Sequence, residues 1–305
     1  MRYAFHTLDV FTDRIFGGNP LAVFPEARGL SDAQMQRAAA EFNLSETVFV
    51  LPPERGGTRR ARIFTPRAEL PFAGHPTVGT AILLAALGAV KPRDGAATIV
   101  LEEGVGDVPV AVRFEGDRPV FAQLTAAQAP ELGPPAPTPE ALAAALGLTP
   151  DEILGAPHAP AVVSCGVPFL FIALRDRAAV GRARGEAAAW ERASAGLRGA
   201  EPYVYALATG SPAASIHSRF FAPRFGIAED PATGSAAVAL AGLLAMRAPR
   251  ADADLEWTIE QGIEMGRPSL LYAEAEKRGG VVTATRVGGS AVRVTEGWME
   301  FPDAG

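Results

Sequence analysis

The sequence is poor in the residues that build redox and metal sites. Its 305 residues include a single cysteine, Cys165, and only four histidines. One thiol excludes an intrachain disulfide and any mechanism that uses two thiols. The histidines show no metal-ligand spacing, and the sequence contains no HExxH, zinc-ribbon or Walker-type motif. The sequence therefore gives no indication of a metal or nucleotide site.

Positive charge and long apolar runs are also scarce. The 28 Lys and Arg residues are outnumbered by 34 Asp and Glu residues, so the net charge is -6. No basic cluster alternates with aromatic residues, which argues against nucleic-acid binding. No run approaches the roughly 18 uninterrupted apolar residues of a membrane-spanning helix, and the segment MRYAFHTLDVFTD has no apolar signal core. We expect a cytoplasmic protein that binds neither nucleic acid nor membrane.

What the sequence does contain is an internal repeat. Residues 62–67 (RIFTPR) match 219–224 (RFFAPR), and 75–81 (HPTVGTA) match 230–236 (DPATGSA). Three weaker matches keep the same order: 18–24 with 166–172, 45–50 with 200–205, and 99–104 with 257–262. A repeat of this length predicts two similar halves, and 305 residues with 48% hydrophobic content are enough for about two domains.

Hydrophobic periodicity predicts the same structure in each half. Alternating stretches such as RARIFTP and VPVAVRF are typical of strands, whereas long helical patterns are few. One helix is predicted at 31–43, with Ser31 as N-cap and Gln34 three residues on. We therefore predict an α+β protein of two mainly β units, each with a central helix.

The expected domains follow from the repeat. They are an N-terminal half at 1–125, an Ala/Pro-rich linker with short helices at 126–160, and a C-terminal half at 161–305. The glycine-punctuated stretches after residue 279 are typical of antiparallel hairpins. The final strand either closes the second sheet or returns to the first half.

Two helix starts are the first candidate functional elements. Proline is favoured at the first helical position, so Pro76 and Pro231 each indicate a helix N-terminus, with His75 and Asp230 at or near the N-cap. First-turn N–H groups lack helical partners and lie at the positive end of the helix dipole. We expect the two starts to face one another across a cleft and to hold a carboxylate or enolate.

Glu46 is the candidate proton carrier. It lies between a predicted helix and a predicted strand, with Leu44 and Val48 as apolar neighbours. Apolar surroundings disfavour the charged form of a carboxyl group and bring it toward the pH at which it both donates and accepts a proton. Simpler interpretations stay open at this point: Glu46 as a solvated residue at a strand edge, Asp230 as a plain N-cap, and Asn19 as part of a turn.

Five segments together resemble the phenazine-biosynthesis PhzF-like family. They are GNPLAVF (18–24), NLSETVFV (43–50), FTPRAELPFAGHPTVGTA (64–81), EDPATGSAA (229–237) and QGIEMGRPS (261–269). The resemblance implies the diaminopimelate-epimerase-like fold, in which two pseudo-symmetric domains each wrap a mainly antiparallel sheet around a central helix and share an active site between them. It also implies a homodimer that uses no metal or organic cofactor.

The resemblance also assigns roles. Glu46 is the general acid/base that moves a proton between two carbons of the substrate, while His75, Asp230 and Ser235 assist protonation and bind polar groups. The substrate-binding residues that we predict are Asn19, Ser45, Gly74, Thr77, Thr233 and Gly234. The related epimerases have a cysteine at both positions held here by His75 and Asp230. Their absence excludes a two-thiol racemase, and the acid/base role falls to Glu46.

We therefore predict a cofactor-independent isomerase that acts on a small carboxylate-bearing molecule. The best-known activity of the family is isomerisation of a dihydro-hydroxyanthranilate in phenazine biosynthesis, so a compound of that type is the candidate substrate. Two alternatives are a non-catalytic scaffold that binds a small acid and an amino-acid epimerase that uses non-thiol acid/base residues.

Overall fold

The computed structural model describes residues 1–197, 199–207, 209–222 and 227–302. It contains two compact units. Unit 1 comprises Met1–Thr125 and Gly288–Gly305, and unit 2 comprises Ala126–Val287. The end of the repeated segment RFFAPR, at 223–224, lies outside the described residues. None of the helices in the described ranges is long and apolar enough to cross a membrane.

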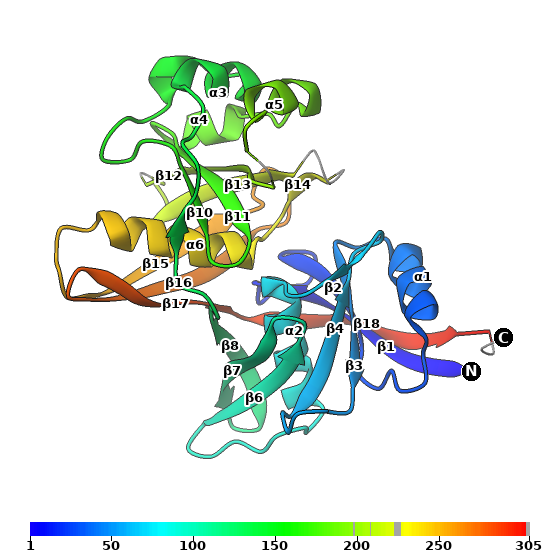
Figure 1. Cartoon of the computed structure of the whole chain (residues 1–305). Coiled ribbons are helices and arrows are strands. Elements are labelled where there is room, and N and C mark those ends of the chain that lie inside the picture. The colour runs from blue at the N-terminus through cyan, green and yellow to red at the C-terminus, as the bar shows by residue number, and fades with distance from the viewer. Residues whose placement is uncertain (198, 208, 223–226, 303–305) are drawn as a thin grey trace. The chain divides into compact units, whose positions relative to one another are not determined.

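Unit 1 is built on a curved, mixed sheet (Figure 1). Its strands are β1 (Arg2–Val10), β2 (Asn19–Phe24), β3 (Glu46–Leu51), β4 (Arg59–Phe64), β5 (Glu69–Leu70), β6 (Ala96–Glu103), β7 (Gly106–Glu115), β8 (Arg118–Thr125) and β18 (Ala291–Glu300). They pair in the order β18-β1-β2-β3-β4-β6-β7-β8, with β5 beside β4. The β2–β3 and β4–β6 pairs are parallel and the others antiparallel. The sheet is thus mainly antiparallel, as predicted.

Two helices complete unit 1. Helix α1 (Asp32–Phe42) begins with the predicted capping box between Ser31 and Gln34 and packs on a cluster of buried rings that includes Phe24 and Phe49. Helix α2 (Gly74–Ala86) is buried over 12 of its 13 residues. It contacts β1, β2, β3, β6, β7, β8 and β18. A helix that touches both ends of the strand order is enclosed by the sheet, which confirms the predicted central helix.

Unit 2 repeats this plan with additional helices. Its elements are β9 (Glu131–Leu132), α3 (Pro139–Leu146), η1 (Pro150–Glu152), β10 (Ala161–Ser164), β11 (Pro168–Ala173), α4 (Arg177–Arg182), α5 (Ala187–Ala193), β12 (Glu201–Ala206), β13 (Ile216–Ala222), β14 (Ile227–Asp230), α6 (Gly234–Arg247), β15 (Ala253–Gln261), β16 (Ser269–Arg278) and β17 (Val281–Gly289). The strands pair in the order β9-β10-β11-β12-β13-β15-β16, with β14 beside β13. Helix α6 is the counterpart of α2 and contacts β10, β11, β15 and β16.

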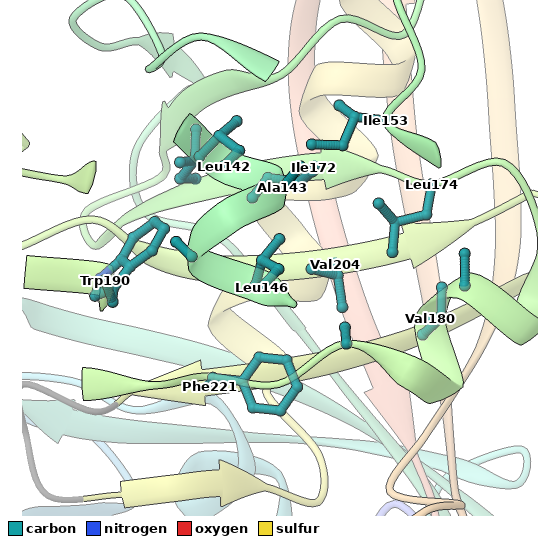
Figure 2. Packing of buried hydrophobic residues seen from close by; sticks show 14 of the residues in the cluster. Leu142, Ala143, Leu146, Ile153, Ile172, Leu174, Val180, Trp190, Val204 and Phe221 are labelled. Atoms are coloured by element: carbon teal, nitrogen blue, oxygen red, sulfur yellow. The ribbon is translucent and has the colours of Figure 1, made fainter. Parts of the chain in front are cut away.

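The sheet of unit 2 is covered on both faces. Helices α3, α4 and α5 cover one face with a cluster that Figure 2 shows; its labelled members are Leu142, Ala143, Leu146, Ile153, Ile172, Leu174, Val180, Trp190, Val204 and Phe221. Leu142 and Leu146 come from the segment 126–160 that we expected to be a linker, so this segment contributes to the core of unit 2. Figure 1 shows α6 on the opposite side of the strands.

The repeat is exact at the level of strand register. Corresponding residues of the two halves lie opposite corresponding partners. The pairs are Leu21–Glu46 and Phe169–Glu201, Phe49–Arg62 and Val204–Arg219, and Arg60–Glu102 and His217–Glu260. Identical register in both units confirms the predicted pseudo-symmetry, because a one-residue slip would reverse the face of every side chain.

The helix starts differ from the prediction. Helix α2 begins at Gly74 after the N-cap Ala73, so Pro76 is its third residue rather than its first. Helix α6 begins at Gly234 after Thr233, and Asp230 is the last residue of β14. Asp230, predicted at or near the N-cap, lies three residues before the N-cap Thr233. The reason is tertiary: the side chain of Gln261 donates to the carbonyl oxygen of Asp230 and accepts from the backbone N–H of Thr233, which holds the main chain there in a non-helical conformation.

Candidate active site

The central feature of unit 1 is a contact between the two residues that the sequence singled out for proton transfer. Glu46 opens β3, and His75 is the second residue of α2. The Oε2 atom of Glu46 lies 3.4 Å from Nε2 of His75, and the two side chains are 15% and 6% exposed. This distance is longer than an ordinary hydrogen bond, although catalytic contacts are often long before substrate binds. We call these residues the Glu46–His75 pair.

The protonation state of His75 follows from its surroundings. The imidazole makes a hydrogen bond with the backbone of Pro20. Because proline has no N–H, the ring is the donor. Nε2 forms no hydrogen bond with any described residue, so the donor is Nδ1. Burial lowers the pKa of His75 to about 3. The ring is therefore neutral near pH 7, with the lone pair of Nε2 available to the carboxyl group of Glu46.

The contacts of His75 bring three predicted segments together. Asn19 is fully buried at the start of β2 and directly precedes Pro20, which accepts the hydrogen bond from His75. Ser45 is partly buried and precedes Glu46. Gly74, the first residue of α2, precedes His75. The structure thus gathers the segments 19–20, 45–46 and 74–75, which are far apart in the sequence.

Thr77, which we predicted to bind substrate, lies in the first turn of α2. Its side chain is buried, and its hydroxyl oxygen lies 2.7 Å from the carbonyl oxygen of Ala73 and 2.7 Å from Oε1 of Glu103. Both polar contacts of this hydroxyl are therefore internal to unit 1. Glu103 was not singled out by the sequence. Its carboxyl group is buried, which raises its pKa to about 8 against the opposing effect of the Thr77 hydrogen bond.

In unit 2, Asp230 belongs to a buried hydrogen-bonded group that we call the Asp230 cluster. The hydroxyl of Thr233 donates to Oδ2 of Asp230 at 2.6 Å. The amide nitrogen of Gln261 donates to the carbonyl oxygen of Asp230 at 2.8 Å and to Oγ1 of Thr233 at 2.9 Å. Gly234 and Ser235 follow as the first two residues of α6, and Ser235 is partly buried. The structure thus brings together the four predicted residues of the second half.

The Asp230 cluster extends to residues that sequence reasoning did not identify. The hydroxyl of Tyr203 on β12 lies within hydrogen-bonding distance of Oγ of Ser218 and Oε1 of Gln261. Burial raises the pKa of Tyr203 above its ordinary value, so this side chain stays a phenol. A signal for Gln261 was present: the matched segments 99–104 and 257–262 both end in an acid or amide followed by glycine.

The motif QGIEMGRPS at 261–269 packs against the main chain next to the Asp230 cluster. Gly262 has a φ of +78°, and a Cβ there would lie 2.4 Å from the carbonyl oxygen of Arg267 and 2.7 Å from that of Pro231. The hydroxyl of Ser269 donates to the same Pro231 oxygen at 2.9 Å. Only glycine permits this close approach, so the motif fixes the chain that carries Asp230.

Buried charges reinforce the same part of unit 2. The ring nitrogens of His217 lie 2.9 Å from carboxylate oxygens of Glu260 and Glu264. Arg219 makes a bidentate ion pair with Glu229 at 2.8 Å. Together these contacts tie β13, β14 and the turn after β15 into one rigid support.

Thiol and metal chemistry find no support among the described side chains. Burial raises the pKa of the Cys165 thiol to about 11, so it is protonated at neutral pH and a poor nucleophile. Within residues 1–197, 199–207, 209–222 and 227–302, no group of three or more His, Cys, Asp or Glu side chains is arranged to hold a metal ion.

Comparison with known proteins gives consistent matches along nearly the whole chain. The family model described as phenazine biosynthesis-like protein matches residues 8–297. An uncharacterized isomerase of Mesorhizobium japonicum is 44% identical over 95% of this chain and 96% of its own length. The trans-2,3-dihydro-3-hydroxyanthranilate isomerase of Pseudomonas aeruginosa is 38% identical over 95% of this chain and 96% of its own. A Bacillus anthracis protein of the PhzF family has the same fold, with a TM-score of 0.89 at 24% identity over 99% of this chain and all of its own.

Proposed function

The chain belongs to the phenazine biosynthesis-like family, and from that premise we propose that this isomerase moves a proton between two carbon atoms of a small carboxylate-bearing substrate, without a cofactor. Glu46 is the acid/base of this reaction. The observation that carries the proposal is the Glu46–His75 pair, in which a partly buried carboxyl group faces the lone pair of a neutral imidazole.

The chemistry of the pair suits a proton shuttle. The carboxylate of Glu46 removes a proton from one carbon, and the electrons of that C–H bond enter the conjugated system of the substrate. The protonated carboxyl group then returns the proton to a second carbon, so the reaction needs no oxidant or reductant. His75 accepts a hydrogen bond from protonated Glu46 at Nε2. Because the pKa of His75 is about 3, the proton stays on the carboxyl group and remains available for return.

The Asp230 cluster contains the site residues that we predicted in the second half of the chain. We propose that Asp230 and Ser235 bind polar groups of the substrate, in line with the resemblance. The hydroxyl of Thr233 and the amide of Gln261 both donate toward the Asp230 segment, and these donors hold the carboxylate in a fixed orientation. A fixed carboxylate is better suited to orienting an amine or hydroxyl of the substrate than a mobile one.

The proposed substrate is a compound of the dihydro-hydroxyanthranilate type. Support comes from the isomerase of Pseudomonas aeruginosa, whose name gives trans-2,3-dihydro-3-hydroxyanthranilate as its substrate and which is 38% identical to this chain. The alignment covers 96% of that protein, so no large region of it lacks a counterpart in this chain.

Proton NMR in D₂O tests the proposal directly. Purified protein is incubated with dihydro-hydroxyanthranilate and with a panel of other unsaturated or α-chiral acids, and deuterium incorporation is followed. We expect Glu46→Gln to lower exchange by at least about 100-fold, since loss of a general acid/base typically costs 10²–10⁴-fold. Glu41→Gln, at an exposed carboxyl group near the end of α1, is the matched control and should leave the rate unchanged.

The outcomes of this experiment distinguish the proposed isomerase from the two alternatives. Exchange at a single chiral carbon of an amino acid, with racemisation, would support the epimerase interpretation. Binding of an acid without any deuterium exchange would support a non-catalytic scaffold. Exchange that persists in Glu46→Gln would contradict the assignment of Glu46.

A further inference from the structure

The strands β6 and β15 correspond to each other in the repeat, and their last residues have side chains of similar shape but different chemistry. In the matched segments 99–104 and 257–262, Glu103 of β6 corresponds to Gln261 of β15. Each side chain makes a hydrogen bond to a threonine hydroxyl near the start of the central helix of its unit, although Thr77 and Thr233 are not at matched positions of the repeat. An acid and an amide therefore occupy the same place in a repeated structure.

The hydrogen-bond geometry in unit 1 determines which partner carries the proton. The hydroxyl oxygen of Thr77 lies 2.7 Å from both the carbonyl oxygen of Ala73 and Oε1 of Glu103. A hydroxyl has one proton, and a carbonyl oxygen only accepts. Both contacts are hydrogen bonds only if Thr77 donates to Ala73 and Glu103 donates to Thr77. Glu103 is then a neutral carboxylic acid.

Burial favours the same state. Glu103 is only 4% exposed, and its Oε2 atom forms no hydrogen bond with any described residue. A buried carboxylate in this position would leave a charge without compensation, whereas a neutral acid has a much smaller desolvation cost. The pKa of Glu103 is accordingly raised to about 8, with burial as the largest cause.

Among the described residues, none of the charged or titratable groups around this end of β6 makes an ion pair with the carboxyl group of Glu103. These groups are Arg55, Arg59, Arg60, His75, Glu102 and Asp107. The guanidinium of Arg55 donates to the main-chain oxygen of Glu103, and Glu102 accepts from the backbone N–H groups of the loop 54–57. Burial is the cause of the raised pKa of Glu103, and the contact with Thr77 only partly offsets it.

In unit 2 the hydrogen bonds are donated in the same direction, from the strand end to the threonine, but the donor is an amide that does not titrate. The Nε2 atom of Gln261 donates to Oγ1 of Thr233, which in turn donates to Oδ2 of Asp230. The orientation of the amide is fixed, because its Oε1 atom accepts from the backbone N–H of Thr233 at 3.2 Å. In both units a neutral donor at the strand end passes a hydrogen bond through a threonine hydroxyl to the segment that holds the candidate site residue.

We propose that Glu103 is a positioning residue that acts in its neutral form, donating a hydrogen bond through Thr77 to fix the first turn of α2 and thereby the place of His75 beside Glu46. The turn from Ala73 to Thr77 contains His75, so the threonine contact holds its two ends together. Ionisation of Glu103 removes the donor and loosens this turn. The consequence for activity rests on the proposed function of the Glu46–His75 pair.

The variant Glu103→Gln separates this proposal from a merely structural role. An amide keeps a donor but does not titrate, which reproduces the arrangement of Gln261. We expect Glu103→Gln to retain at least about half of the wild-type exchange rate at pH 7. Wild-type exchange should fall about tenfold from pH 7 to pH 9, because about one tenth of a group with a pKa near 8 is still protonated at pH 9. Glu103→Gln should lack that loss.

The comparison variant is Glu103→Ala, which removes the donor at every pH. We expect its exchange rate to be about 10- to 100-fold lower at pH 7, as for a catalytic group displaced by about 1 Å. Three results would overturn the proposal: equal losses in Glu103→Gln and Glu103→Ala, the same alkaline loss in Glu103→Gln as in wild type, or failure of Glu103→Gln to fold, since a neutral amide must fit.

A direct titration distinguishes failure of this proposal from failure of the proposed function. In protein labelled with ¹³C at glutamate carboxyl carbons, the signal that disappears in Glu103→Gln belongs to Glu103. We expect it to report a protonated carboxyl group at pH 7 and to titrate near pH 8, whether or not any substrate reacts. A carboxylate signal at pH 7 would contradict the neutral donor, while an inactive protein with the expected titration would count against the substrate or Glu46 alone.

Discussion

At the scale of single residues, burial sets the charge state of the candidate site. His75 is neutral because its ring is enclosed by unit 1, and the same enclosure keeps Glu103 protonated. The two shifts have opposite signs because burial disfavours the charged form, which is the acid form of histidine and the base form of glutamate. Glu103 is thus neutral at pH 7, where a solvated glutamate is charged, and His75 stays neutral below about pH 6.5, where a solvated histidine becomes charged.

The buried histidine makes stability depend on pH in a defined direction. The unfolded chain binds a proton at His75 below about pH 6.5, whereas the folded chain does so only near pH 3. Between these values the unfolded state holds more protons, so the free energy of unfolding falls as pH falls, by about 1.4 kcal/mol per unit at most. Replacement of the histidine by a neutral side chain removes this contribution.

We therefore expect wild type to lose about 2 kcal/mol more stability than His75→Gln between pH 7 and pH 5. Urea unfolding at both pH values measures the difference. The comparison between pH 7 and pH 8 is an internal control, because His75 is neutral there in both the folded and the unfolded chain. Parallel losses in the two proteins between pH 7 and pH 5 would contradict the lowered pKa of His75.

At the scale of elements, α2 is positioned by close contact with the strands that carry the site. A Cβ at Gly79 would lie 2.6 Å from Cγ2 of Val10 and 2.7 Å from Cδ2 of Leu21. These distances are below van der Waals contact, so any larger residue pushes the helix away from β1 and β2. Because Pro20 is on β2 and His75 is on α2, such a displacement reaches the candidate site.

Gly79→Ala is expected to lower the free energy of unfolding by about 1–3 kcal/mol, although alanine is intrinsically the better helix former by about 1 kcal/mol. Chemical denaturation measures the change, and deuterium exchange into substrate should fall with it. Gly155→Ala is the control, because no atom lies within 4 Å of the added Cβ. A stabilised Gly79→Ala protein would show that the helix adjusts freely.

Sequence reasoning was most successful for elements that carry their own signal. Alternating apolar residues predicted strands such as β7, in which Val108, Val110 and Val112 are buried while the residues between them are exposed. The capping box of α1 needs only Ser31 and Gln34, four residues of local sequence. The internal repeat then predicted the same plan, a mainly antiparallel sheet with a central helix, in both halves.

The errors and omissions arose where distant residues decide local structure. The start of α6 is set by contacts between Thr233 and Gln261, which are 28 positions apart. Glu103 was missed because its neutral state depends on enclosure by the sheet, and an acid followed by glycine at a strand end gives no indication of burial. The motifs had assigned Glu46 and His75 to one candidate site, but they did not predict the contact between the two side chains, and the roles of both residues stay predictions.

At the scale of the whole molecule, the chain leaves unit 1 at β8 and returns to it with β18. The returning strand pairs antiparallel with β1 along its length. Phe301, just beyond it, is buried against the rings of Tyr3 and Phe24. The sequence had left open whether the last strand closes the second sheet or joins the first half, because a hairpin pattern does not identify its neighbour.

We expect Phe301→Ala to destabilise unit 1 by about 3–5 kcal/mol, the usual cost of deleting a buried aromatic ring. Hydrogen exchange resolved along the chain is the appropriate measurement, since amides in β1, β2 and α1 should lose protection while those of β11 and β12 keep theirs. Trp298→Ala is the control, because that side chain is 60% exposed. Equal loss of protection in both units would indicate that they unfold as one.

The return of β18 also fixes an order of events during protein synthesis. The strands β1 to β8 leave the ribosome first, but the edge of β1 stays open until β18 is made. Between them lie the roughly 160 residues of unit 2, which take roughly 10–30 s to translate at 5–20 residues per second. The half that is synthesised first is therefore completed last, and its exposed edge must survive that interval without pairing with another nascent chain.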